Sequence, residues 1–228
     1  MTNNINYNFL NVLYLCVFDL KLNSQMIEEI KKLIQQEAKA ISDIPVNSTF
    51  IEAINIIHEA VHINKGKVIS SGMGKAGEVA HWVSNTFSST GTPGVFLHAS
   101  DAQHGDLGML QPNDVLFLVS NSGKTRELLE LVDLVYRLYE NIPIVLLTGE
   151  KDSPLAKMAN VVLFTGKPDE VCPLGMAPTT SLTVMTVIGD VLVAMMMKKI
   201  NFTVEDYAKR HHGGYLGAKS REIIGRIS

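Results

Sequence analysis

The segment that decides the fold is Asp114–Glu130, with the sequence DVLFLVSNSGKTRELLE. Its first part, Val115–Val119, is a short run of aliphatic and aromatic residues, which is typical of a strand buried on both faces. The run ends abruptly in SNSG at 120–123, and apolar residues then recur at helical spacing from Leu128 onward. The segment therefore predicts a buried strand, a hydroxyl-rich turn and an amphipathic helix.

A turn of this kind is a candidate site for an anion. Backbone N–H groups are free in the first turn of a helix, the helix dipole is positive there, and this turn adds two serine hydroxyls. Phosphate is the anion that such a site most naturally takes. The simpler interpretation is an ordinary strand-to-helix turn that uses Ser and Gly for conformational reasons.

The composition fits one globular α/β domain. The chain has 228 residues, of which 46% are hydrophobic and 19% are charged, a soluble balance that leaves little room for a second full domain. The net charge of -3 gives no electrostatic argument for nucleic acid or an anionic membrane surface. The two cysteines, Cys16 and Cys172, have no paired spacing, which indicates a reduced compartment.

Two apolar stretches bear on membranes. Residues 9–18 would cross only about a third to a half of a bilayer, and they lack the basic region and the cleavage site of a signal peptide. Residues 184–197 are interrupted by Asp190, which predicts a buried helix. We therefore expect a cytoplasmic protein with no membrane contact. Residues 1–24 form either an extra packing arm or an upstream extension, and residues 25–228 form a single domain.

The rest of the chain alternates strands with helices. We expect helices at 27–41, 50–64, 78–88, 125–140, 154–159, 179–199 and 204–209, and strands at 67–70, 94–98, 115–119, 143–147 and 161–164. This alternation predicts a five-stranded, mostly parallel sheet with helices on both faces, a three-layer α/β sandwich. With the flavodoxin-like strand order 2-1-3-4-5, a crevice lies outside the carboxyl ends of the first and third strands.

Both strand ends at this crevice carry Gly/Ser loops, Ser70–Gly77 and Ser120–Thr125, and this convergence favours the phosphate site. A dinucleotide site competes, because the first loop contains GxGxxG at 72–77. However, the second strand ends in His98, where that site needs an acidic residue, and a dinucleotide requires no second hydroxyl-rich loop. The Walker A and nucleophile-elbow patterns both lack a required glycine.

Several further motifs resemble those of the D-arabinose-5-phosphate isomerases, which are sugar isomerase (SIS) domain proteins. The motifs are TFSSTGTP at 86–93, HGDLGM at 104–109, CPLGMAPTTS at 172–181, FTVEDYA at 202–208 and HHGGYLG at 211–217. The resemblance covers roughly residues 27–219. It implies interconversion of D-ribulose 5-phosphate and D-arabinose 5-phosphate with no cofactor and no catalytic metal, supplying the precursor of Kdo for lipopolysaccharide or capsule.

The resemblance also implies roles for single residues. The catalytic positions are Lys75, Glu127, Glu170 and His211. The substrate and phosphate pocket corresponds to Ser71, Gly72, Gly74, His104, Ser120, Asn121, Ser122, Gly123, Thr125, Thr180 and Ser181. Isomerisation through an enediolate needs a base beside the carbonyl carbon and a donor to the carbonyl oxygen. Either glutamate can be the base, while His211 serves ring opening or oxygen protonation and Lys75 offsets the enediolate charge.

These residues also have simpler interpretations. Glu127 in a first helical turn complements the helix dipole, and Lys75 alone would be solvated. No two of the seven histidines have zinc-site spacing with a third ligand, so a metal ion at His98, His104 or His211 would be adventitious. The alternative function is a non-catalytic regulatory protein that binds a phosphosugar. Such a protein needs the serine loops but not the four catalytic residues together. A related activity on another sugar phosphate is a variant of the first function.

The chain departs from the family in two respects. Most members continue into a pair of CBS modules, whereas this chain stops at Ser228, so nucleotide regulation through such modules is not expected. His212 replaces the proline that usually follows the catalytic histidine. The apolar surplus of residues 27–41 and 179–199 predicts self-association, and the resemblance implies a homotetramer. We expect His104 and His211 to cross the subunit boundary.

Overall fold

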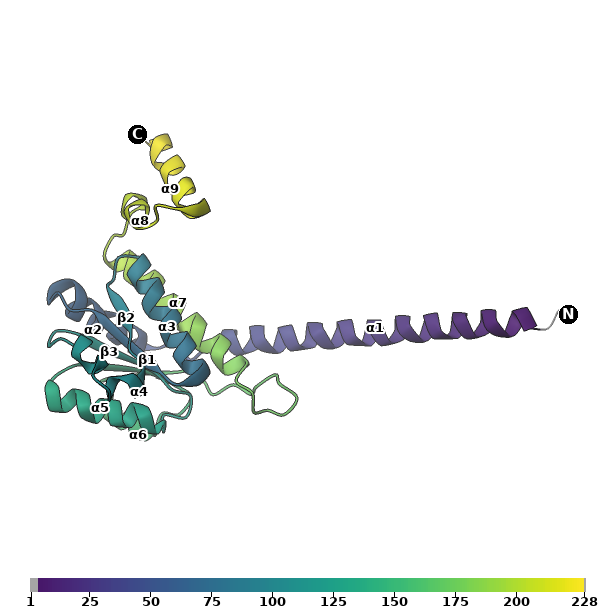
Figure 1. Ribbon diagram of the computed structural model, residues 1–228, viewed down its shortest axis with the longest axis horizontal. Helices are drawn as coiled ribbons and strands as arrows, with labels where there is room; N and C mark the ends of the chain where they lie inside the picture. The colour runs from purple at the N-terminus through teal and green to yellow at the C-terminus, as the bar shows by residue number, and fades with distance from the viewer. Residues whose placement is uncertain (1–3, 228) are drawn as a thin grey trace.

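The computed structural model describes residues 4–227, with side chains from 22 to 226. Its centre is a five-stranded sheet in which every neighbouring pair of strands is parallel (Figure 1). The strands are β1 (Val68–Gly72), β2 (Gly94–Phe96), β3 (Val115–Val119), β4 (Ile144–Thr148) and β5 (Val161–Phe164). Their order is β2-β1-β3-β4-β5, which confirms the predicted flavodoxin-like topology.

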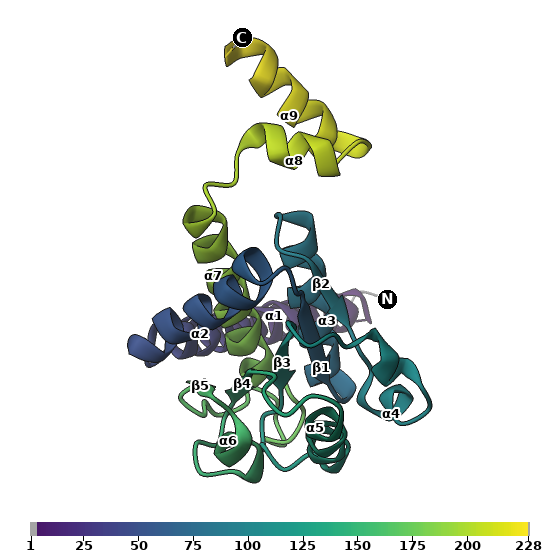
Figure 2. The same ribbon diagram turned by 90° about the vertical axis from the view of Figure 1, so that its left-hand side faces the viewer.

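Helices cover both faces of the sheet, as predicted. One side holds α2 (Ser48–His58), α3 (Gly74–Ser89), α7 (Thr180–Lys199) and the end of α1 (Asn4–Ser42). The other side holds α4 (Ala99–Ala102), α5 (Arg126–Leu138) and α6 (Pro154–Met158) (Figure 2). The chain ends with α8 (Val204–Arg210) and α9 (Gly214–Ile227), which project away from the sheet in both views.

The central strand β3 divides the core into two halves. Val115, Phe117 and Val119 pack with α2, α3 and α7, whereas Leu116 and Leu118 pack with α5. Successive side chains of a strand point to opposite faces, so a strand covered on both sides must be apolar at every position. All five residues of β3 are fully buried, which places the turn that follows it at the edge of a rigid sheet.

Three helices differ from the sequence prediction. Helix α3 begins at Gly74 rather than at residue 78. Helix α1 begins at Asn4 rather than near residue 27, because no glycine or proline interrupts the residues between. Its first half extends away from the domain (Figure 1). Helix α9 was not predicted, because Gly213-Gly214 indicated an irregular end, whereas the helix starts directly at Gly214 with φ +67°. A π-helical turn at Glu59–Ile63 also extends α2.

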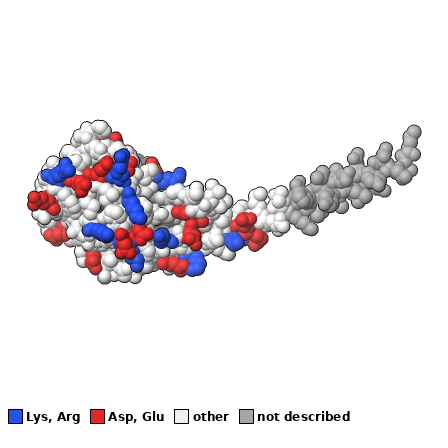
Figure 3. Space-filling model, turned by 90° about the horizontal axis from the view of Figure 1, so that it is seen from below, with Lys and Arg blue, Asp and Glu red and all other residues white. Residues whose placement is uncertain are grey.

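Helix α7 is the core helix that the sequence predicted. Among the residues described, it is long and apolar enough to cross a membrane by length and composition alone. It packs against α1, α2 and α3, and half of its apolar window is buried within the domain. Its apolar character is therefore explained by packing. On the face shown in Figure 3, acidic and basic side chains are intermingled over the domain.

Candidate functional site

A cavity of about 580 Å³ lies at the carboxyl ends of β1, β3 and β4. Six of the sequence-predicted site residues line it: Lys75, Ser120, Asn121, Ser122, Thr125 and Ser181. The remaining lining residues are Met73, Ala76, Lys124, Gly149, Glu150, Lys167, Pro178 and Leu182. The crevice therefore occupies the topological switch point that the strand order predicts.

Hydrogen bonds within the turn hold the loop between β3 and α5 in place. Ser120 Oγ and Thr125 Oγ1 share a hydrogen bond of 2.8 Å, and Gly123 N–H donates to Ser120 Oγ at 3.2 Å. Ser122 Oγ accepts from the backbone N–H of Lys124 at 3.2 Å. The hydroxyls at the cavity are thus fixed to the loop itself, which orients them before any ligand binds.

Position 123 requires a glycine because of its backbone conformation and because Ser153 packs closely against it. Its φ of +60° lies in the left-handed region, and a Cβ atom there would stand 2.0 Å from Ser153 Oγ. Gly72 is required for a different reason, since its Cβ would approach Ala76 O within 2.8 Å. The first turn of α3 therefore packs directly against the end of β1. This close approach brings Lys75 to the cavity.

Two helices present their N-termini to the cavity. Helix α5 starts after Thr125 and α3 starts after Met73, and no side-chain cap is found at either start in the part of the chain that the structure describes. Uncapped first turns leave backbone N–H groups available, and the helix dipole adds a partial positive charge. Such helix starts are suited to bind an anion.

The charged lining is mostly basic, with Lys75, Lys124 and Lys167 against the single acidic residue Glu150. Lys167 Nζ lies 3.0 Å from Glu150 Oε2, and the hydrogen bond and charge of Lys167 lower the pKa of Glu150. Sequence analysis missed Glu150 and Lys167. Both follow the carboxyl ends of strands, β4 and β5, so the argument that located the two serine loops could have included them.

Glu170 caps the first turn of α7. Its Oε2 accepts hydrogen bonds from Thr179 N–H at 2.7 Å, Thr179 Oγ1 at 2.9 Å and Ser181 N–H at 3.2 Å, and its Oε1 accepts from Ser181 Oγ. Burial is the largest single influence and raises the pKa of Glu170. The four hydrogen bonds together outweigh it and lower the pKa below its ordinary value. The carboxylate is therefore held in its ionised form.

Glu170 does not line the large cavity. It lines a neighbouring cavity of about 350 Å³, which shares Lys167 with the first. Ser181 connects the two, because it lines the large cavity and donates its hydroxyl to Glu170. Thr180 points elsewhere: its Oγ1 accepts from Val171 N–H at 3.1 Å and donates to Glu37 Oε1 at 3.0 Å.

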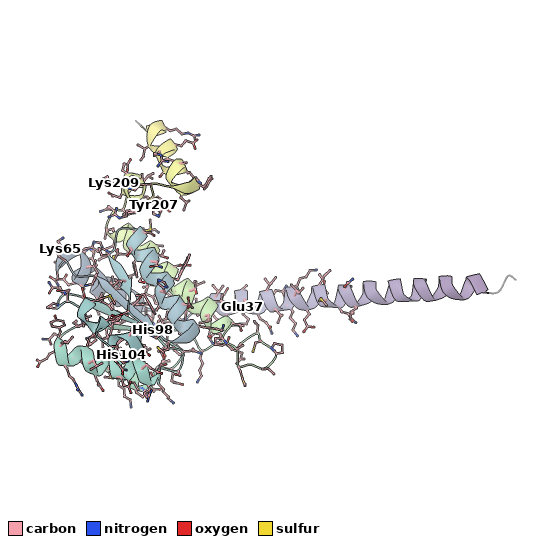
Figure 4. All side chains as sticks on the ribbon, viewed as in Figure 1. Glu37, Lys65, His98, His104, Tyr207 and Lys209 are labelled. Carbon is pink, nitrogen blue, oxygen red and sulfur yellow. The ribbon has the colours of Figure 1, made fainter. Side chains whose placement is uncertain are left out.

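Four of the other predicted residues, Glu127, Ser71, Gly74 and His104, do not line the crevice. Glu127 is in the first turn of α5, half-buried and outside the lining. Ser71 is fully buried in β1, and its Oγ has no hydrogen-bond partner within residues 22–226. Gly74 starts α3 with φ +55°. His104 is exposed after α4 (Figure 4).

His211 directly follows α8, and the segment α8–α9 lies away from the sheet (Figure 1). Its ring stacks on Tyr207 with centroids 3.7 Å apart, and its Nδ1 lies 3.0 Å from Tyr207 O. The structure therefore does not place His211 in the crevice of its own chain. His98 Nδ1 lies 3.7 Å from Asp101 Oδ2, and no metal-binding group of three or more ligands occurs among the described residues.

The SIS domain family model matches residues 63–195, more than half of the chain, and the chain belongs to this family. The chain is 57% identical to a solved structure from Bacteroides fragilis, which is described as a phosphosugar isomerase involved in capsule formation. The two structures superpose with a TM-score of 0.82, and the match covers 83% of this chain and 99% of the other. An Escherichia coli CFT073 protein solved in complex with arabinose 5-phosphate is 33% identical, with a TM-score of 0.77 over 83% of this chain and 98% of its own.

The chain is also similar to curated proteins named arabinose 5-phosphate isomerase. Arabinose 5-phosphate isomerase KdsD of Shigella flexneri is 42% identical over 186 residues, which cover 82% of this chain and 55% of that protein. The enzyme of the same name from Yersinia pestis is 38% identical over 92% of this chain and 62% of its own length. The chain thus spans a little over half the length of these relatives.

Proposed function

We propose that this protein is an aldose–ketose isomerase that interconverts D-ribulose 5-phosphate and D-arabinose 5-phosphate through an enediolate. The observation that carries the proposal is the crevice itself, where a serine-rich turn, two uncapped helix starts and three lysines meet beside a hydrogen-bonded carboxylate. The relatives named arabinose 5-phosphate isomerase support this choice of sugar.

The phosphate group binds at the start of α5. Ser120, Ser122 and Thr125 supply hydroxyls, and the free N–H groups of the first helical turn supply further donors. Lys124 adds a positive charge at the same point, and Gly123 allows the backbone to come close. The buried hydroxyl of Ser71 has no protein partner among the described residues, which supports a role beneath the bound ligand.

The sugar then extends toward Lys75 and Ser181. A glutamate takes the proton from carbon 2 of the open-chain aldose, and the electron pair forms the enediolate as oxygen 1 is protonated. A proton is then returned to carbon 1 while oxygen 2 gives up its hydroxyl proton, which yields the ketose. Glu170 is one candidate for the base. Its hydrogen bonds lower its pKa, which keeps the carboxylate ionised but also makes it a weaker base. Glu127 is the other candidate, and Lys75 offsets the charge of the enediolate. No step in this sequence requires a metal ion.

The complete site requires a second subunit. The segment α8–α9 holds His211 away from the crevice of its own chain, and His104 is exposed. Apolar side chains that are exposed on the single chain support self-association, including Ile34 of α1 (63% exposed) and Trp82 of α3 (54% exposed). We propose a homotetramer in which His104 and His211 reach a neighbouring subunit.

We propose that the enzyme acts in the cytoplasm and supplies a precursor for lipopolysaccharide or capsule. The test is conversion of D-arabinose 5-phosphate to D-ribulose 5-phosphate in the presence of EDTA, for wild type, Glu127→Gln and Glu170→Gln. We expect turnover by the wild type and a loss of orders of magnitude in the variant that lacks the base. Binding of the sugar phosphate without turnover would instead identify a phosphosugar-binding regulator.

A further inference from the structure

Glu37 is a partly buried carboxylate on α1 that the proposed reaction does not use. Its Oε1 accepts a hydrogen bond of 3.0 Å from Thr180 Oγ1, a residue 143 positions later in the chain. Its Oε2 is buried and has no hydrogen-bond partner among the side chains described. Figure 4 shows Glu37 on the part of α1 beside α7. Burying a carboxylate oxygen without a partner costs stability, so its presence requires an explanation.

The bond to Glu37 fixes the hydroxyl of Thr180. A threonine hydroxyl has one proton and two lone pairs. Because the proton is donated to Glu37, a lone pair of the oxygen faces Val171 N–H, which donates to it at 3.1 Å. Val171 directly follows Glu170. Glu37 therefore orients the group that anchors the backbone beside a candidate catalytic carboxylate.

Glu170 binds the same helical turn through the two residues next to Thr180. Thr179 and Ser181, the two neighbours of Thr180, donate four hydrogen bonds to Glu170. The first turn of α7 is thus held between two carboxylates, one from α1 and one from the loop after β5. A shift of Thr180 would move Ser181, which lines the large cavity, together with the partners of Glu170.

We propose that Glu37 is a positioning residue for the isomerase: acting through Thr180, it holds Ser181, which lines the crevice, and Glu170, in the neighbouring cavity, in place. This inference rests on the proposed function. Glu37 lies outside residues 63–195, the segment that matches the SIS domain model. Helix α1 is accordingly part of the architecture of the site, although none of its residues from 22 to 42, whose side chains the structure describes, lines the large cavity.

The first test is kinetic. Glu37→Ala should lower kcat about tenfold with KM nearly unchanged, because a displaced catalytic group costs rate more than binding. Glu37→Gln keeps an acceptor oxygen for Thr180 and should retain most of kcat. Glu29→Ala, at an exposed position of the same helix, is the matched control and should behave as wild type.

The second test asks whether Glu37 acts through Glu170. In the Glu170→Gln background, Glu37→Ala should cause little further loss, because the group that it positions has been removed. Thr180→Val removes the connecting hydroxyl at similar volume and should reproduce the effect of Glu37→Ala without adding to it. Fully additive losses in either combination would overturn the inference, as would a Glu37→Ala enzyme with unchanged kcat.

Hydrogen exchange gives a measurement that does not depend on activity. Amides in residues 168–183 should exchange faster in Glu37→Ala than in wild type, and not in Glu29→Ala. If the wild type does not turn over the sugar, the proposed function fails, and the exchange data alone decide whether Glu37 anchors this segment. If the wild type is active and exchange is unchanged in Glu37→Ala, the inference about Glu37 fails and the function stands.

Discussion

The carboxylate of Glu170 accepts hydrogen bonds from Thr179 and Ser181, the residues on either side of Thr180. Burial would favour its protonated form, but the hydrogen bonds from Ser181 and Thr179 have the larger combined effect and lower the pKa. The start of α7, with the positive end of its dipole, also favours a negative charge at this point. The carboxylate thus stabilises the start of the helix and is itself kept in its ionised form.

The lowered pKa predicts how stability depends on pH. Glu170 has a lower pKa in the folded protein than its ordinary value of 4.5, so its contribution is fully present above that value. The contribution is lost as the pH falls through the lower pKa of the folded state. We therefore expect wild type to be more stable than Glu170→Gln at pH 7. The difference in stability between the two proteins should shrink as the pH falls below 4.5, the ordinary pKa of a glutamate. Thermal unfolding of both proteins across this range measures it, and a difference that grows toward low pH would contradict the assignment.

At the level of single residues, sequence alone located part of the site. Ser120, Ser122 and Thr125 could be placed at the crevice because they follow a strand whose burial pattern is unambiguous. Thr180 and Ser181 could not be told apart, because the rotation of α7 decides which hydroxyl faces the cavity, and packing sets that rotation. Glu37 gave no signal in the sequence, since its partner is distant along the chain.

At the level of elements, Asp114 joins the starts of the two central strands. It is fully buried directly before β3, and its Oδ1 accepts from the backbone N–H of Lys67, directly before β1, at 2.8 Å. Its Oδ2 accepts from Lys67 Nζ at 2.7 Å and from Gln111 N–H at 2.8 Å. A buried carboxylate with three donors sets the relative position of β1 and β3, the strands whose carboxyl ends form the site.

Removing this carboxylate should destabilise the whole domain. We expect Asp114→Ala to lower the free energy of unfolding by about 3 kcal/mol, because it leaves the Lys67 ammonium and two backbone N–H groups without their partner. Urea unfolding at a fixed protein concentration measures the loss. Asp133→Ala, at an exposed position of α5, is the control and should change stability by less than about 0.5 kcal/mol. Equal stability of the two variants would contradict this role.

The strand order and the β3–α5 unit were predictable, because a fully apolar strand followed by a clear amphipathic helix has few alternatives. The ends of the chain were less predictable. Helix α1 continues through residues 20–27 because nothing there breaks a helix, and α9 starts at a glycine pair that normally indicates a loop. Glu150 and Lys167 were missed because only the ends of the first and third strands were considered, although both residues follow strand ends at the same edge of the sheet.

At the level of the whole molecule, the crevice of one chain is lined by Lys75 and the serine-rich turn between β3 and α5, whereas the segment α8–α9, with His211, lies away from the sheet. The proposed tetramer resolves this separation by sharing sites between subunits. If each site combines Glu127 of one chain with His211 of another, two inactive variants should complement each other.

Subunit mixing tests this arrangement. If Glu127 is the base, His211→Ala and Glu127→Gln should each be inactive. Their mixture, after dissociation and reassociation, should then recover about a quarter of wild-type activity, because random pairing restores that share of sites. Light scattering should show a tetramer for each protein. A monomer at micromolar concentration, or inactive mixtures that contain both subunits, would rule out the shared site.

The central claim is that the sugar phosphate is isomerised at this crevice through an enediolate intermediate. Isomerisation in D₂O measures the proton transfer of this reaction directly. Glu127 and Glu170 are both partly exposed, so the proton on either base should exchange with solvent before it is returned. We predict that the wild type, with EDTA present, places deuterium on carbon 1 of D-ribulose 5-phosphate and carbon 2 of recovered D-arabinose 5-phosphate, and that a Glu127→Gln/Glu170→Gln double variant places none. Conversion without any deuterium incorporation, or no conversion at all, would contradict the account.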